Sequence, residues 1–169
     1  MTQNPVAEWK LNELSGTTVS DSSGNNVIGT IYGGATWVPG RNGNALRFNG
    51  LDSYVDFGTP IILPHGNSPR TISMWVYNEN IFNNTYLLFY GSRSNLNATY
   101  LGIITGSINP TVNSGLYMGS WDTTNPELFI PEFFPLNTWK HICLVHDGTT
   151  AAAYGDGQSL GSINSTGWN

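Results

Sequence analysis

The chain has 169 residues, enough for one ordinary domain that buries a core without disulfides or a structural metal. Only 10% of its residues are charged, and 6 Lys and Arg against 11 Asp and Glu give a net charge of −5. This balance leaves no basic stripe for nucleic acid, and no apolar run has the length of a membrane span. We therefore expect a single domain over residues 1–169, with neither nucleic acid nor a membrane span among its interactions.

Short apolar or alternating runs recur along the chain between groups of Gly, Asn, Asp, Ser and Pro, a pattern typical of an all-β protein. No segment keeps a helical period. The predicted strands are, in chain order, Ala45–Phe48, Ser53–Phe57, Thr71–Tyr77, Tyr86–Tyr90, Tyr100–Ile104, Leu116–Trp121, Trp139–Val145, Ala151–Tyr154 and Gln158–Ile163.

Three of these predictions are more detailed. The first two strands alternate apolar and polar residues and are expected to be joined by a tight connection. The strand Thr71–Tyr77 carries bulky residues on both faces, as expected of a central strand. Gly155, Asp156 and Gly157 tolerate a left-handed backbone and predict a hairpin turn between the last two strands.

Several longer blocks follow one another in a familiar order. They are Trp9–Thr17, Asp21–Asn26, Trp37–Gly50, Thr71–Val76, Asn137–Ile142 with His146–Thr149, and the Y-x-D-G sequence Tyr154–Gly157. Together they resemble the laminin-G-like jelly-roll domains of the concanavalin A-like lectin/glucanase superfamily, over nearly the whole chain. The resemblance implies an all-β fold, a jelly-roll sandwich of two antiparallel sheets.

The resemblance also implies further strands beyond the Tyr154–Gly157 hairpin, with an acidic pair in the last one, whereas this chain ends at Asn169. The final strands of the family pattern are thus expected to be missing. An open sheet edge is a template for pairing with another chain, so we expect neighbouring subunits and a larger assembly.

The sequence gives little support for catalysis. Glucanases of this fold use an E-x-D-x-E strand that places two carboxylates about 5 Å apart, and the chain has no such motif. Glu127 and Glu132 are separated by a segment containing Pro131, which favours a loop. The single cysteine, Cys143, is expected to be a small buried hydrophobe. We therefore expect a protein that is not an enzyme, with a glycoside hydrolase as a distant alternative.

One turn has residues suited to a calcium ion. Asp21, Asn25 and Asn26 offer oxygen atoms within a short glycine-containing segment, as a hard cation requires. Related domains often bind Ca²⁺ here with help from the position of Asn49, where the family commonly has Asp. The alternative is that Asp21 and Asn25 accept hydrogen bonds from their own backbone in Asx turns.

A ligand surface is expected in the segments between the family blocks, because exposed aromatic rings stack on sugars and polar side chains bind their hydroxyls. The candidate ligand-binding residues are Tyr100, Tyr117, Trp121 and Asp122. The tryptophans inside the family blocks are expected to be packing residues: Trp9, Trp37, Trp75 and Trp139.

Two functions from different classes remain open. The first is a recognition module that binds a glycan or a protein surface through the sandwich loops. The second is a structural subunit on a virion surface, favoured by the early chain end and by the apolar segment Phe129–Pro135, a possible contact with a neighbour. The N-terminus shows no signal-peptide pattern, and the sequence leaves the localisation open, with a virion or a cell-surface assembly compatible with it.

Overall fold

The computed structural model describes residues 4–79, 85–92, 97–104, 115–120 and 127–166. These residues contain strands and no helix, and therefore no helix that could cross a membrane. Every strand pairing among them is antiparallel, which confirms the predicted all-β class. The chain forms two compact units, Met1–Leu63 and Pro64–Asn169. We describe each by itself, and the single domain over residues 1–169 stays a prediction.

The first unit contains five short strands. Strands β1 (Thr18–Val19), β2 (Gly29–Tyr32) and β5 (Tyr54–Asp56) form one sheet, and β3 (Thr36–Pro39) pairs with β4 (Asn44–Arg47). Val19, Ile31 and Leu46 are buried at its centre. Trp9, Leu11, Ala35, Trp37, Val55 and Phe57 pack around them. This core confirms the packing role predicted for Trp9 and Trp37.

The strands predicted at Ala45–Phe48 and Ser53–Phe57 do not pair with each other across the connection that joins them. Both strands exist as β4 and β5, but β4 pairs with β3 and β5 pairs with β2. Asn49 explains the loop between them, because its Oδ1 atom accepts hydrogen bonds from the backbone N–H groups of Leu51, Asp52 and Ser53. This capped loop directs β5 away from β4.

Two adjacent glycines directly after β2 allow the close packing against this loop to be tested with a matched pair of substitutions. Gly33 and Gly34 both have positive φ, 69° and 77°, but a Cβ atom on Gly33 would lie 2.3 Å from the carbonyl oxygen of Asp52, whereas one on Gly34 would meet nothing within 4 Å. We expect Gly34→Ala to lower the free energy of unfolding by about 1 kcal/mol. Gly33→Ala should cost about 1 to 2 kcal/mol more because the backbone must shift. Urea denaturation checks both, and equal losses would contradict the close approach.

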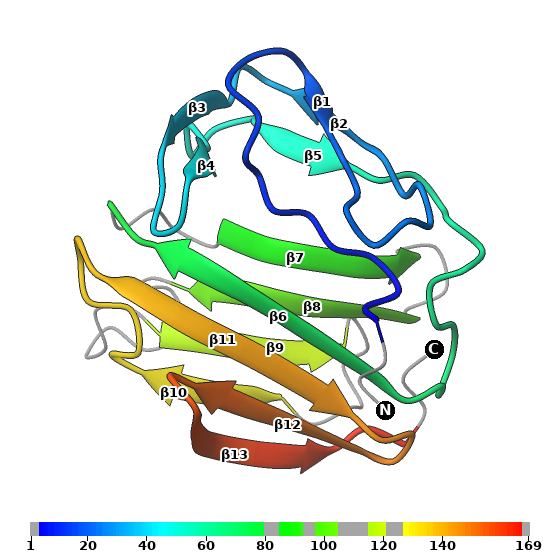
Figure 1. Cartoon of the computed structure of the whole chain (residues 1–169). Coiled ribbons are helices and arrows are strands. Elements are labelled where there is room, and N and C mark those ends of the chain that lie inside the picture. The colour runs from blue at the N-terminus through cyan, green and yellow to red at the C-terminus, as the bar shows by residue number, and fades with distance from the viewer. Residues whose placement is uncertain (1–3, 80–84, 93–96, 105–114, 121–126, 167–169) are drawn as a thin grey trace. The chain divides into compact units, whose positions relative to one another are not determined.

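The second unit is a two-layer sandwich (Figure 1). One sheet has the order β13-β12-β11-β6 and the other β10-β9-β8-β7. The strands are β6 (Arg70–Tyr77), β7 (Thr85–Ser92), β8 (Asn97–Ile104), β9 (Gly115–Ser120), β10 (Leu128–Pro131), β11 (Trp139–His146), β12 (Thr150–Gly155) and β13 (Gln158–Asn164). Both sheets contribute to one core, formed by Leu116, Met118, Phe134, Ile142, Leu144, Ala151 and Ala153.

Strand alternation explains this core. Along β11 the buried residues Ile142 and Leu144 alternate with half-buried ones, and along β12 Ala151 and Ala153 do the same. The hairpin predicted at Gly155–Gly157 is confirmed, because Gly155 pairs with Gln158 across a two-residue turn of positive φ.

Two expectations about this unit are corrected. Strand β6 is the last strand of its sheet among the described residues, not a central one. Glu127 and Glu132 flank a strand that the sequence pattern missed, β10, whose Pro131 lies at its end on the outer strand of the sheet. In the segment Phe129–Pro135, the side chain of Phe134 is buried in the unit's own core, with Ile130 and Phe133 packed against it.

A buried polar cluster lies at the start of β6. Arg70 donates hydrogen bonds from Nη1 to the carbonyl oxygens of Gly66 and Ser68, and its guanidinium lies 5.4 Å from the ring centre of Tyr90. His146, paired with Arg70 across the sheet, is only 1% exposed. Burial of the imidazole, and then the charge of Arg70, lower the pKa of His146.

This lowered pKa predicts how stability depends on pH. A histidine that is harder to protonate in the folded state binds its proton first in the unfolded state. The free energy of unfolding should therefore have its full value above about pH 6.5, the ordinary pKa of histidine. At lower pH it should decrease by up to about 1.4 kcal/mol for each pH unit, until the pKa of His146 in the folded state is reached. Denaturation curves of the wild type and of His146→Gln check this, and an equal pH slope in both proteins would contradict it.

Candidate binding surface

The side of the β6–β11 pair that faces away from the core carries four rings. Trp75 and Tyr77 of β6 are exposed, at 44% and 39%, because alternation places them opposite the inward-facing Met74 and Val76. The register sets Trp75 beside His141 of β11 and Tyr77 beside Trp139. The ring centroids are 5.0 Å apart in the first pair and 5.2 Å in the second. We call Trp75, Tyr77, Trp139 and His141 the aromatic face.

A hydroxyl group borders this face, and an ion pair lies on the other side of β11, where Lys140 pairs with the inward-facing Val76 and its ammonium is 5.4 Å from the ring centre of Phe133. The Lys140 ammonium is 2.7 Å from Oδ2 of Asp156, whose Oδ1 accepts a hydrogen bond from the backbone N–H of His141. The hydrogen bond from Lys140, followed by that from His141, lowers the pKa of Asp156, so this carboxylate is ionised at neutral pH. Ser73 occupies the next outward position of β6 and is exposed. Rings beside a hydroxyl group can stack on a sugar and bind its hydroxyls.

The structure corrects the role expected of Trp75, which lies on the open side of its sheet and not in the core. Trp139 is half-buried. The missed signal was in the sequence: bulky residues at 75 and 77 alternate with apolar residues at 72, 74 and 76, and in a sandwich only one of these two faces can meet the core.

Two of the predicted ligand-binding residues lie in the other sheet of the second unit. Tyr100 belongs to β8 and pairs with Gly119, and Tyr117 belongs to β9 and is 6% exposed. Trp121 and Asp122 lie outside the described residues. A ligand-binding role for these four residues stays a prediction. Cys143 is half-buried on the same side of β11 as His141, and burial raises the pKa of its thiol.

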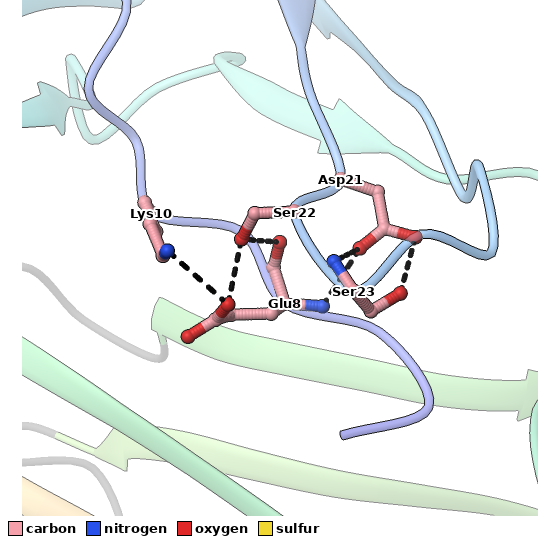
Figure 2. Close-up of polar contacts among 5 residues, drawn as sticks. All are labelled: Glu8, Lys10, Asp21, Ser22 and Ser23. Atoms are coloured by element: carbon pink, nitrogen blue, oxygen red, sulfur yellow. Dashed lines mark hydrogen bonds and ion pairs between the residues drawn. The ribbon is translucent and has the colours of Figure 1, made fainter. Parts of the chain in front are cut away.

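The predicted cation turn is organised around Asp21, as Figure 2 shows. The Oδ1 atom of Asp21 accepts hydrogen bonds from the backbone N–H groups of Glu8 and Ser23, at 2.9 and 2.8 Å. Its Oδ2 atom accepts from the Ser23 hydroxyl and from the N–H of Val27, at 2.8 and 3.0 Å. Both lone pairs of each oxygen are therefore in use. Burial raises the pKa of Asp21, but these bonds outweigh it and hold that pKa far below its usual value.

Two of the three amides predicted to join Asp21 also bind groups of the protein. Asn25 donates from Nδ2 to the carbonyl oxygen of Val6, and Asn49 donates from Nδ2 to Gly33 and to the carboxylate of Asp52. Asn26 is exposed with a φ of 61°. The described residues hold no cluster of three or more His, Cys, Asp or Glu side chains that could bind a metal. The bond from the Ser23 N–H supports the Asx-turn alternative for Asp21, whereas Asn25 contacts the distant Val6 instead, and the calcium site itself stays a prediction.

Calcium addition separates the two interpretations. Because a cation at Asp21 would have to displace protein donors, we expect no change in melting temperature on adding Ca²⁺ to protein first treated with a chelator. Mg²⁺ serves as the control for a general salt effect. A rise in melting temperature with Ca²⁺ alone, lost in Asp21→Asn, would support the cation site instead.

Comparison with known families identifies a superfamily. The model of the concanavalin A-like lectin/glucanases superfamily matches residues 48–169. The chain belongs to this superfamily. The match begins at the end of β4 and covers all of the second unit, including the aromatic face. A search of curated protein sequences with this chain found no match.

Solved structures support the same fold. The chain is similar to domain 4 of AbnA, a GH43 extracellular arabinanase from Geobacillus stearothermophilus solved in complex with arabinotriose, with 24% identity and a TM-score of 0.61 over 86% of this chain and 69% of that chain. It is also similar to the binding domain of Paraclostridial Mosquitocidal Protein 1, with 18% identity and a TM-score of 0.63 over 88% and 40%. A third is an S-layer domain-containing protein from Clostridium thermocellum, with 23% identity and a TM-score of 0.57 over 92% and 70%.

Proposed function

We propose that this superfamily member is a non-catalytic recognition module that binds carbohydrate through the aromatic face. The observation that carries the proposal is the exposure of Trp75 and Tyr77 on one side of a sheet whose other side is the core. Leaving two large rings in water gives up the free energy of burying them, which a ligand would recover. Two neighbouring outward positions on β6 place their Cα atoms about 6.7 Å apart. This spacing suits a short oligosaccharide lying along the strand.

The solved relatives support a binding role of this kind. Domain 4 of AbnA was solved with arabinotriose, and the second relative is named as a binding domain. These likenesses concern the fold, so they guide the choice of ligands and do not identify one. The sequence has no E-x-D-x-E motif. Among the described residues, Glu127 and Glu132, which flank β10, belong to no cluster of three or more His, Cys, Asp or Glu side chains. Recognition without hydrolysis is the function that these features favour.

Binding and hydrolysis can be measured on the same preparation. We expect the wild-type protein to be retarded in native gels that contain a matching polysaccharide, with arabinan in the first panel, and to release no reducing sugar from it. Isothermal titration with oligosaccharides then gives the affinity. Folded protein that binds no glycan in a broad panel would overturn the proposal, and steady release of reducing ends would replace recognition with catalysis.

A further inference from the structure

The charges around the aromatic face indicate which glycans it can accept. We infer that the ligand is a neutral glycan, and that the face rejects glycans carrying carboxylates or sulfates. This inference rests on the proposed function, because it names the ligand class of the same surface.

The first question is which cationic side chains could contact an anionic ligand. An anionic sugar needs Lys or Arg to replace the water that its charge loses. In the described part of the second unit, the cationic side chains are Arg70 and Lys140. Arg70 is 7% exposed and is directed by its hydrogen bonds toward the carbonyl oxygens of Gly66 and Ser68. It is therefore buried away from the surface that a ligand would meet.

Lys140 is already engaged in an ion pair. It forms the 2.7 Å ion pair with Asp156, and its side chain is only 25% exposed. The pair cancels its own charge, and Lys140 lies on the other side of β11, because it pairs with the inward-facing Val76 and its ammonium is 5.4 Å from the ring centre of Phe133. Lys140 therefore brings no positive charge to the aromatic face.

The rings act in the same direction. The face of an aromatic ring carries partial negative charge, which attracts the C–H groups of a sugar and repels an anion. The chain as a whole has a net charge of −5, which adds a weak long-range repulsion. Rings and net charge therefore both disfavour an anionic glycan, and the described residues provide no Lys or Arg on this side to oppose them.

A chemically matched pair of ligands tests the inference. The probes are neutral polysaccharides of the binding panel and the same polysaccharides after oxidation of their primary hydroxyls to carboxylates. We expect binding of the neutral forms to change little between low and high salt, and the oxidised forms to bind at least about tenfold more weakly at low salt. Tighter binding of the oxidised forms would overturn the inference and leave the proposed function intact. Absence of binding by either form would instead count against the proposed function.

A gain-of-function variant makes the test independent of lost folding. Ser73→Arg adds a cation on the exposed outward side of β6, next to Trp75, and should raise the affinity for the oxidised polysaccharide at least about tenfold at low salt. The matched control is Thr30→Arg, which adds the same charge at an exposed position of β2 in the first unit. An equal gain in both variants would show that only net charge matters and would contradict a ligand on the aromatic face.

Discussion

Replacing Trp75 and Tyr77 together with alanine is expected to abolish carbohydrate binding and to leave the free energy of unfolding within about 1 kcal/mol of the wild-type value. Both side chains are exposed on the outer side of β6, so their removal leaves no core cavity. A ligand that stacks on them would lose two anchors, each worth about 2 kcal/mol if they behave as hot spots. The expected loss of affinity is therefore at least about 100-fold by isothermal titration.

The first unit supplies a control of the same chemistry. Tyr32 and Tyr54 pair across β2 and β5, are 47% and 53% exposed, and stack with their ring centroids 5.1 Å apart. Their joint replacement with alanine removes a similar exposed aromatic area and should leave binding unchanged. If this variant loses binding while the Trp75 and Tyr77 variant keeps it, the ligand surface lies in the first unit and the assignment to β6 is wrong.

Asp21→Ala is expected to destabilise the first unit more than any other exposed or half-buried substitution considered. The change removes an acceptor from three backbone N–H groups, those of Glu8, Ser23 and Val27, and from the Ser23 hydroxyl. Val27 is 5% exposed, so water replaces its missing partner poorly. With charge-assisted hydrogen bonds worth about 1.5 to 3 kcal/mol each and partial replacement by water, the expected loss is about 3 to 4 kcal/mol in urea denaturation.

Two variants and a pH series make this prediction specific. Asp21→Asn keeps the size of the side chain but turns one acceptor into a donor, so it should lie between alanine and the wild type. Asp56→Ala removes an exposed carboxylate that accepts from the N–H of Gly58 and should cost under about 1 kcal/mol. Because the pKa of Asp21 is depressed, its contribution is complete above about pH 4, the ordinary value for Asp, and is lost only in stronger acid. A gap between wild type and Asp21→Ala that closes already near neutral pH would contradict this account.

The local part of the fold was predictable from the sequence. The two alternating sets of residues in Thr71–Tyr77, the strand at Trp139–Val145 and the turn at Gly155–Gly157 depend on alternation and on backbone preferences within a few residues. The superfamily was also readable, because its motifs are short stretches in a fixed order.

Pairing and exposure were decided by the tertiary structure. The alternating strands β4 and β5 look like partners in the sequence, yet β4 pairs with the preceding strand β3 and β5 pairs with the more distant β2, and Asn49 caps the loop between β4 and β5. Trp75 looks like a core residue, yet the core meets only the Met74 side of β6. Sequence by itself determined which residues alternate, cap and turn, since these depend on neighbours along the chain. Only the folded structure decided which face is covered and which donors surround Asp21, because those contacts join residues that are distant in sequence.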